Sequence, residues 1–308
     1  MRVIRAIKDI GPLPQCALTI GNFDGIHKGH QVLIKKTVDF AKENGIKSAA
    51  FTFANHPKNY FDPGSVKNIF GEEEKIELME KFGIDYLINI PFEKFMTRVS
   101  PKTFVEDVLV NKIHVKKITV GHDFTFGRQK EGDTDTLSDL GKKYGFEVEV
   151  IEPIKEDNKR ISSTYIRGLI EDGNMKDIPR YLGRNYSVKG EVIHGRANGR
   201  KIGFPTANIK LDQELVIPRR GIYASIIHIE NKHYFGATNV GYNPTVNGRS
   251  LSVETHIIDF NKEIYGKRVK VEFLERIRDE VKFKSMEELK QQLCRDVSFV
   301  RANYMSEE

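Results

Sequence analysis

Residues 17–30 read ALTIGNFDGIHKGH, an apolar run that leads into a glycine-rich turn. The run is typical of a buried strand, and a helical pattern follows the turn over residues 30–44. Four more β-rich runs, separated by further helical patterns, lie at residues 48–53, 86–90, 117–120 and 146–151. The later helical patterns cover residues 72–82, 101–111 and 134–144. This alternation predicts a doubly wound α/β domain with a parallel sheet.

The pattern changes after about residue 185, where β-type runs become closely spaced. These runs cover residues 186–193, 222–229, 234–240, 252–257 and 268–277, with glycines and prolines between them. They predict a small antiparallel barrel. Ser285 and Glu288 form a capping box, which predicts a closing helix that ends near Asn303. We therefore expect two domains, residues 1–184 and residues 185–308.

Composition sets limits on the class of protein. The 308 residues are 39% hydrophobic and 30% charged, a mixture that can bury two cores. The 49 basic and 43 acidic residues leave 49 − 43 = +6, which favours anionic ligands without forming the dense basic arm of a nucleic-acid binder. Cys16 and Cys294 have no disulfide or metal spacing, and no apolar run has membrane-spanning length. We expect a cytoplasmic protein with no nucleic-acid or membrane partner; the sequence leaves the oligomeric state open.

The turn after the first strand has the composition of a phosphate site. Its backbone N–H groups and the dipole of the following helix face the edge where such sheets bind ligands. His27 and His30 are three residues apart, and Gly29 between them permits close backbone approach. Both imidazoles can therefore reach one phosphate group. The alternative is an ordinary turn, which would leave two histidines and three glycines without a packing purpose.

Three later segments are candidates for the same site. Residues 162–164 begin a helix with hydroxyl groups, and Arg167 lies one turn later; this arrangement binds a phosphate or merely caps the helix. Asn55 and its neighbour His56 follow the second strand. They either hydrogen-bond a ligand or only form the turn after this strand. Residues 121–128 follow the fourth strand and include aromatic residues beside glycines. The aromatic rings could either stack on a flat ligand or pack against each other inside the loop.

The second half carries its own candidate site. Residues 195–209, GRANGRKIGFPTANI, place three glycines and several basic residues between strands, a composition that suits a polyphosphate. Thr206 and Asn208 offer hard oxygen ligands to Mg²⁺. The alternative is an inert basic hairpin loop. Glu254 lies in a strand, where alternation places Val253 and Thr255 on the opposite face, and the nearby phosphate loop favours a catalytic role over a solvated one.

Several motifs resemble one family over nearly the whole chain. Residues 21–30 match the GxFDGxHxGH signature of the nucleotidyltransferase domain of prokaryotic bifunctional riboflavin kinase/FAD synthetases. Residues 161–167 are similar to its second nucleotide signature, ISSTxxR, and residues 203–208, GFPTAN, to the hallmark of its kinase barrel. After the second strand the family often has Phe-Asp-Pro-His-Pro; Ala54 and Asn55 replace the Asp and Pro here, so that Asp has no counterpart.

The resemblance implies a Rossmann-like nucleotidyltransferase domain that adenylylates FMN with ATP, giving FAD and pyrophosphate. It implies a kinase barrel that phosphorylates riboflavin with MgATP, giving FMN and ADP. The implied catalytic residues are His27 and His30 in the first domain and Glu254, as the base, in the second. The implied ATP contacts are Gly21, Asn22, Phe23, Asp24, Gly25, Gly29, Ser163, Thr164, Arg167, Gly199, Arg200, Lys201, Gly203, Thr206 and Asn208. The implied flavin contacts are Asn55, Asp123 and Phe126, and the implied Mg²⁺ ligands are Thr206 and Asn208.

The two reactions need different residues. A ribityl hydroxyl must lose a proton as it attacks, so the kinase needs a carboxylate base. The FMN phosphate is already an anion, so adenylylation needs positioning and charge stabilisation. Two alternatives remain. One is a nucleotidyltransferase fused to a nucleic-acid-binding barrel, in which the Pro-Thr-Ala-Asn turn has no purpose. The other is an adenylyltransferase for another phosphorylated vitamin, which leaves the second half idle.

Overall fold

The computed structural model describes residues 1–195, 199–213, 215–245 and 248–305, without the side chains of residues 200–201, 243–245 and 248–250. Its contacts divide the chain into two compact units, Met1–Ser163 and Thr164–Glu308. Among the helices in these described ranges, none is long and apolar enough to cross a membrane.

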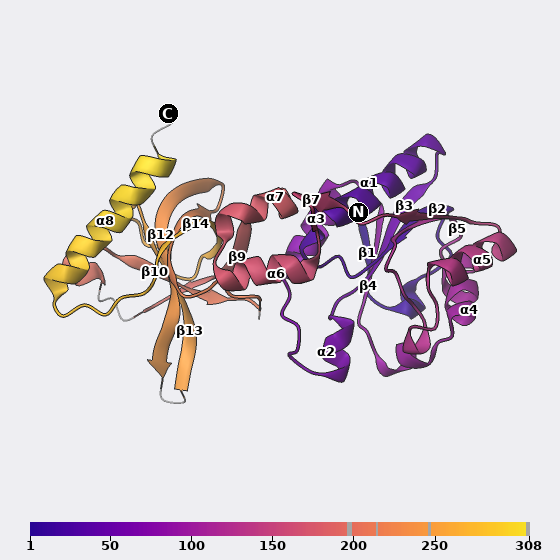
Figure 1. Ribbon diagram of the computed structural model, residues 1–308, viewed down its shortest axis with the longest axis horizontal. Coiled ribbons are helices and arrows are strands. Elements are labelled where there is room, and N and C mark those ends of the chain that lie inside the picture. Colours follow the sequence, from indigo (N-terminus) through magenta and orange to yellow (C-terminus); the bar gives the residue numbers. More distant parts are fainter. Residues whose placement is uncertain (196–198, 214, 246–247, 306–308) are drawn as a thin grey trace. The chain divides into compact units, whose positions relative to one another are not determined.

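The first unit is built on a parallel sheet of six strands (Figure 1). The strands are β1 (Arg2–Ile4), β2 (Cys16–Ile20), β3 (Lys47–Phe53), β4 (Tyr86–Ile90), β5 (Val115–Gly121) and β6 (Glu147–Ile151), in the order β1-β4-β3-β2-β5-β6. The five predicted strands are confirmed. The edge strand β1 was missed because three residues are too short to show a period; it pairs in parallel with β4.

The strand order places one loop at a distinctive point of the sheet. Both neighbours of β2, which are β3 and β5, receive the chain after β2, so the order reverses there. Ligands of doubly wound sheets bind at the carboxyl ends of the strands beside such a reversal. The loop of residues 21–27, which follows β2, lies at this position.

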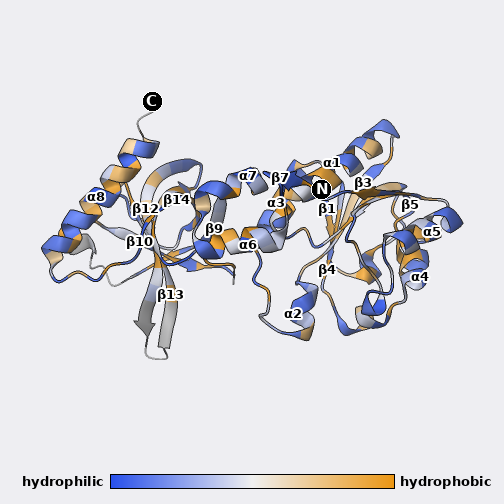
Figure 2. Cartoon of the chain, viewed as in Figure 1, coloured by the Kyte–Doolittle hydropathy of each residue, from blue (hydrophilic) through white to orange (hydrophobic). Residues whose placement is uncertain are grey.

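Helices cover both faces of the sheet. Adjacent residues of a strand point to opposite faces, and Ala50 packs with α1 (Lys28–Glu43) and α3 (Glu72–Lys81). Phe51 instead packs with α5 (Thr134–Tyr144) and a π-helix, η4 (Phe104–Val110). The predicted helix over residues 101–111 is therefore one α-helical turn, α4 (Pro101–Thr103), continued as a π-helix. Figure 2 shows strands of this sheet in the hydrophobic colour.

The second unit contains a closed antiparallel barrel. Its strands are β9 (Tyr186–Ile193), β10 (Thr206–Leu211), β11 (Gly221–Ile229), β12 (Lys232–Thr245), β13 (Gly248–Ile257) and β14 (Arg268–Arg278), in the order β10-β13-β12-β11-β14-β9. Five were predicted. The prediction of a loop up to residue 209 was wrong: β10 begins at Thr206 and closes the barrel between β9 and β13.

The predicted closing helix is α8 (Met286–Tyr304). The Oγ atom of Ser285 accepts a hydrogen bond from the N–H group of Glu288 at 3.1 Å. The Glu288 carboxylate accepts from the N–H group of Lys284 at 2.8 Å, one residue earlier than in the usual capping box. A partly buried ion pair of 2.6 Å between Arg278 of β14 and the buried Asp296 of α8 fixes the helix to the barrel.

Candidate active sites

The loop after β2 is held in an unusual backbone conformation. Phe23, Gly25 and Ile26 have φ angles of 48°, 80° and 38°, a region that Phe and Ile rarely adopt. The side chains of Phe23 and Ile26 are fully buried, and Asp24 accepts a hydrogen bond from the N–H group of Ile69 at 2.9 Å. Burial and this bond thus maintain a shape that the backbone alone disfavours.

The two predicted histidines lie together where this loop enters α1. His27 is the N-cap of α1, and its Nδ1 atom accepts a hydrogen bond from the N–H group of His30 at 3.2 Å. The two rings stack, with centroids 3.6 Å apart. A Cβ atom at Gly29 would lie 3.1 Å from the His27 ring, so glycine leaves room for that ring. The geometry brings both imidazoles to the sheet edge predicted to bind phosphate.

Both histidines are neutral at pH 7. Burial lowers the pKa of His27 to about 4. Burial, followed by the nearby His27 and Lys75, holds the pKa of His30 well below its ordinary value. Because Nδ1 of His27 accepts a hydrogen bond, its Nε2 atom carries the hydrogen and can donate to an oxyanion. Nδ1 of His30 is enclosed and has no hydrogen-bond partner among the described residues.

This shift makes the stability of the first unit depend on pH. A folded-state pKa below the unfolded value gives full stability above about pH 6.5 and a loss as pH falls toward 4. We expect His27 to account for up to about 3 kcal/mol of this loss, at 1.36 kcal/mol per unit of pKa. Denaturant unfolding at pH 7 and pH 5 measures it. His27→Asn keeps a capping acceptor and should lose less stability on acidification; an equal loss would contradict the assignment.

Lys75 is a residue that sequence reasoning missed. It lies on α3 among glutamates, a pattern typical of an exposed face, yet only 8% of it is exposed. Its ammonium group donates to the carbonyl oxygen of Phe53, at the end of β3, at 3.0 Å and to that of Asn22 at 3.4 Å. Burial lowers its pKa to about 8, while Asp24 and Glu72 oppose the shift. Lys75 therefore ties the loop of residues 21–27 to the neighbouring strand.

We expect Lys75→Met to destabilise the first unit by about 2 kcal/mol, because two carbonyl groups lose a charged donor. Denaturant unfolding measures the effect, with the loss of FMN adenylylation activity as the probe of unfolding of the first unit. Lys81→Met is the matched control, since Lys81 is exposed on the same helix. Equal unfolding midpoints for the two variants would show that the buried ammonium group does not stabilise the loop.

The second nucleotide motif reaches this loop through Ser163. Its Oγ atom donates a hydrogen bond to the carbonyl oxygen of Asp24 at 2.9 Å, so residues 139 positions apart meet. Ser163 is the first residue of α6 (Ser163–Asp172), and Thr164 and Arg167 follow on the same helix within the second unit.

Two of the predicted flavin contacts are engaged by the protein itself. The Asn55 side chain accepts from the N–H group of Phe92 at 2.6 Å and donates to its carbonyl oxygen at 3.3 Å. Asp123 is exposed and pairs with Arg160. Asn55 closes a loop in this structure, whereas Asp123 retains solvent access.

Phe126, one of the implied flavin contacts, is buried. The sequence allowed its ring to stack on a flavin or to pack the loop, and the structure places it in the core. It is 8% exposed and packs between Phe104 and Phe124, at centroid distances of 6.1 and 5.5 Å. Any substituent at Gly132 would collide with the Phe126 ring. Phe124, stacked on Phe126, is the partly exposed ring of the pair.

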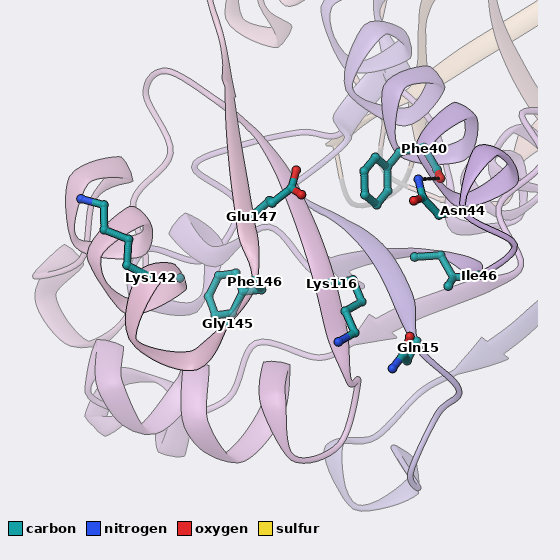
Figure 3. Close-up of a pocket in the computed structure, with 10 residues that line it drawn as sticks. Gln15, Phe40, Asn44, Ile46, Lys116, Lys142, Gly145, Phe146 and Glu147 are labelled. Carbon is teal, nitrogen blue, oxygen red and sulfur yellow. Dashed lines mark hydrogen bonds between the residues drawn. The ribbon is translucent and has the colours of Figure 1, made fainter.

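A separate pocket lies at the opposite edge of the sheet (Figure 3). Gln15, Ile46, Lys116 and Glu147 lie at or just before the amino ends of strands, and Phe40 of α1 also lines the pocket. The volume is about 480 Å³. Because parallel strands place their carboxyl ends on the other edge, this pocket is distinct from the histidine site.

In the barrel, Glu254 lies in a row of polar residues. On β13 its neighbours Val253 and Thr255 are buried, while Glu254 is partly exposed, as alternation predicted. It pairs in register with Asn208 of β10 on one side and Asn239 of β12 on the other. Residues directly opposite in antiparallel strands share a face. The three side chains therefore line one face of the barrel.

Glu254 is also oriented along its own strand. The hydroxyl group of Ser252 donates a hydrogen bond to Oε1 of Glu254 at 2.7 Å, and only 8% of Ser252 is exposed. Such a bond limits the rotation of the carboxylate. Sequence reasoning missed Ser252, since a serine two positions from a glutamate is an ordinary strand pattern.

The GFPTAN segment brings two polar side chains with oxygen atoms to the same face. Thr206 and Asn208 are two residues apart on β10, so they project together, and the backbone at Gly195 lies directly against the Asn208 amide. The N–H group of Phe204 donates to the carbonyl oxygen of Gly199 at 2.9 Å and closes the turn, where Gly203 has a φ of 87°. The side chains of Arg200 and Lys201 lie outside the described residues.

This donor set fits Mg²⁺. The ion commonly takes one or two protein oxygens and completes its coordination with water and substrate phosphates. In the described part of the chain, no group of three or more His, Cys, Asp or Glu side chains could hold a metal. Two neutral oxygens beside one carboxylate are thus suited to a metal that arrives with a nucleotide.

Comparisons with known proteins identify the family of each part of the chain. Residues 11–165 match the FAD synthetase family and residues 182–304 the riboflavin kinase family. A bifunctional riboflavin kinase/FMN adenylyltransferase from Haemophilus influenzae is 38% identical and covers 99% of this chain and 100% of its own. One from Escherichia coli is 34% identical over 96% of both chains. A solved structure, named as a macrolide-efflux protein from Streptococcus pneumoniae, has a TM-score of 0.89 and 34% identity over 98% of both chains.

The order of the two matches along the chain is the order of the two units; the first match includes His27, His30 and Ser163, and the second includes Thr206, Asn208 and Glu254. The chain belongs to the family of bifunctional riboflavin kinase/FMN adenylyltransferases, with the adenylyltransferase part first and the kinase part second.

Proposed function

We propose that residues 185–308 phosphorylate riboflavin through Glu254 and that residues 1–184 adenylylate the resulting FMN through His27 and His30. The observation that carries this proposal is that each family match falls largely on its own compact unit. The boundary at residue 184 is part of the proposal. Residues 164–184 group in space with the barrel, and the family matches leave residues 166–181 unassigned.

In the kinase reaction, the terminal ribityl oxygen of riboflavin attacks the γ-phosphorus of ATP. The new O–P bond forms as the bond to the β-phosphate oxygen breaks, ADP leaves, and the hydroxyl proton passes to the Glu254 carboxylate. Ser252 orients that carboxylate. Thr206 and Asn208 would hold Mg²⁺, which would neutralise phosphate charge when bound.

In the adenylylation reaction, a phosphate oxygen of FMN attacks the α-phosphorus of ATP and pyrophosphate leaves. The attacking group is already an anion, so no base is required. The neutral imidazoles of His27 and His30 donate hydrogen bonds to phosphate oxygens as charge develops. Ser163, Thr164 and Arg167 supply the hydroxyl and guanidinium groups of the second nucleotide motif.

The remaining assignments are finer. Glycines and Asn22 of the first loop contact ATP through the backbone, and Asp123 contacts the flavin; Phe124 takes the stacking place first expected for Phe126. A cytoplasmic location accords with two free cysteines. The proposal requires no nucleic-acid or membrane partner.

Product analysis tests the proposal. Riboflavin, ATP and MgCl₂ are incubated with the purified chain, and chromatography follows FMN and FAD over time. We expect FMN to appear first and FAD to follow, with ADP and pyrophosphate released. Supplied FMN should give FAD without riboflavin. Formation of FAD from FMN with no FMN from riboflavin would refute the kinase assignment, and turnover of phosphopantetheine in place of FMN would refute the adenylylation assignment.

A further inference from the structure

One polar atom beside the kinase base is buried without a partner. Oδ1 of Asn239 is enclosed, and it has no hydrogen-bond partner among the residues that the structure describes. Buried polar groups are nearly always paired, because an unpaired one loses its hydration without compensation. Asn239 lies on β12 in register with Glu254. The orphaned acceptor is therefore a neighbour of the proposed catalytic carboxylate.

The alternation of β12 places Asn239 on the same face as that carboxylate. Thr238 and Val240, on either side of it, are fully buried and pair in register with Thr255 and Val253. Those four residues form the opposite, interior face. Asn239 and Glu254 thus project together from adjacent strands, with Cβ atoms about 5 Å apart in such pairs.

The interior of the barrel at the same level is fully paired. Thr238 is hydrogen-bonded to Ser225 at 2.7 Å and to Thr255 at 2.8 Å, and Ser225 also donates to the carbonyl oxygen of Gly236 at 3.0 Å. The fold therefore satisfies its buried hydroxyls where no ligand is needed. On the face of Glu254, by contrast, the buried Oδ1 atom of Asn239 has no partner among the described residues, and such a departure is typical of a functional site.

We propose that Asn239 is a positioning residue of the kinase site, whose Oδ1 atom accepts a hydrogen bond from a hydroxyl group on the ribityl chain of riboflavin. The inference rests on the proposed kinase function. The oxygen of an amide side chain accepts hydrogen bonds and cannot donate them. The phosphate oxygens of ATP at neutral pH are also acceptors, so Oδ1 of Asn239 cannot form a hydrogen bond with them. The ribityl chain instead carries several donors in sequence.

The position of Asn239 selects among the possible donors. The attacking hydroxyl must lie within hydrogen-bond reach of Glu254, so the adjoining part of the ribityl chain passes beside that carboxylate. The donors of the ATP ribose and adenine lie beyond the triphosphate. Asn208 flanks Glu254 on the other side and is assigned to the metal and phosphates. Asn239 is thus left on the flavin side of the row.

Substitution of Asn239 by leucine, which is similar in size but has no acceptor, tests the proposal. We expect kcat/KM for riboflavin to fall about 3- to 10-fold, the range for one neutral hydrogen bond, with KM for ATP unchanged. FMN adenylylation by the same variant should be unchanged. The melting temperature should be equal or higher, because an unpaired buried acceptor is removed. Lys232→Ala, exposed on the same strand, is the matched control.

Riboflavin analogues that each lack one ribityl hydroxyl identify the bonded group. We expect the natural chain to discriminate against one analogue about 3- to 10-fold more than Asn239→Leu does, since the variant has no bond to lose. Identical discrimination in both proteins would overturn the inference, as would a lower melting temperature with unchanged kcat/KM. If the natural chain formed no FMN from riboflavin, the kinase proposal itself would fail; FMN formation with unchanged Asn239→Leu kinetics would refute this inference alone.

Discussion

Glu254→Gln is expected to lower the rate of riboflavin phosphorylation by about 100- to 10,000-fold, the usual contribution of a general base. The amide keeps the shape of the side chain and an oxygen that can accept the Ser252 hydrogen bond, but it cannot take up the hydroxyl proton. Initial rates of FMN formation from riboflavin and MgATP measure the loss.

Two controls accompany this variant. FAD formation from supplied FMN should continue at the original rate, because that reaction belongs to the other unit. Glu191→Gln replaces an exposed glutamate on β9 of the same barrel and should leave both rates unchanged. Near-normal FMN formation by Glu254→Gln would mean that the attacking hydroxyl loses its proton elsewhere.

His30→Ala is expected to lower FAD formation from FMN by about 100- to 1,000-fold, by analogy with the removal of one oxyanion-hole donor. His27, whose ring stacks on that of His30, remains as a second donor, so part of the stabilisation should survive. Initial rates of FAD and pyrophosphate release measure the effect, while riboflavin phosphorylation serves as the internal control.

A conservative variant separates the donor from the packing of the ring. His30→Gln retains an N–H donor and should recover part of the activity that His30→Ala loses. If a folded His30→Ala protein lost both reactions together, the two sites would not be independent. If it lost neither, the histidine pair would have no part in the transfer.

The architecture followed from sequence patterns because local periodicity specified most elements. One strand of the parallel sheet and one strand of the barrel were not predicted. Arg2–Ile4 forms β1 only because β4 offers an open edge, and Thr206–Leu211 follows a glycine-rich segment whose composition indicated a loop. In both cases the pairing with a distant strand, rather than the local pattern, determines the conformation.

The candidate site residues likewise divide into those that local sequence predicted and those that only distant segments bring together. His27 and His30 lie close together in sequence, so their spacing on a helix start was visible. The neighbours of Glu254 were not, since Asn208 and Asn239 meet it only through strand register. Lys75 was hidden because burial of a lysine depends on carbonyl groups supplied by remote segments. Phe126 was ambiguous because aromatic composition is the same in a packed loop and a stacking platform.

The left-handed residues Phe23, Gly25 and Ile26 carry a consequence for nucleotide affinity. A flexible glycine-rich loop would surrender its conformational entropy each time a nucleotide arrived, and that loss would weaken association. Here the buried Phe and Ile side chains impose the ordering once, during folding. In the proposed adenylylation site this loop would act as a preorganised receptor, and the free energy of nucleotide association would not be diminished by ordering it again.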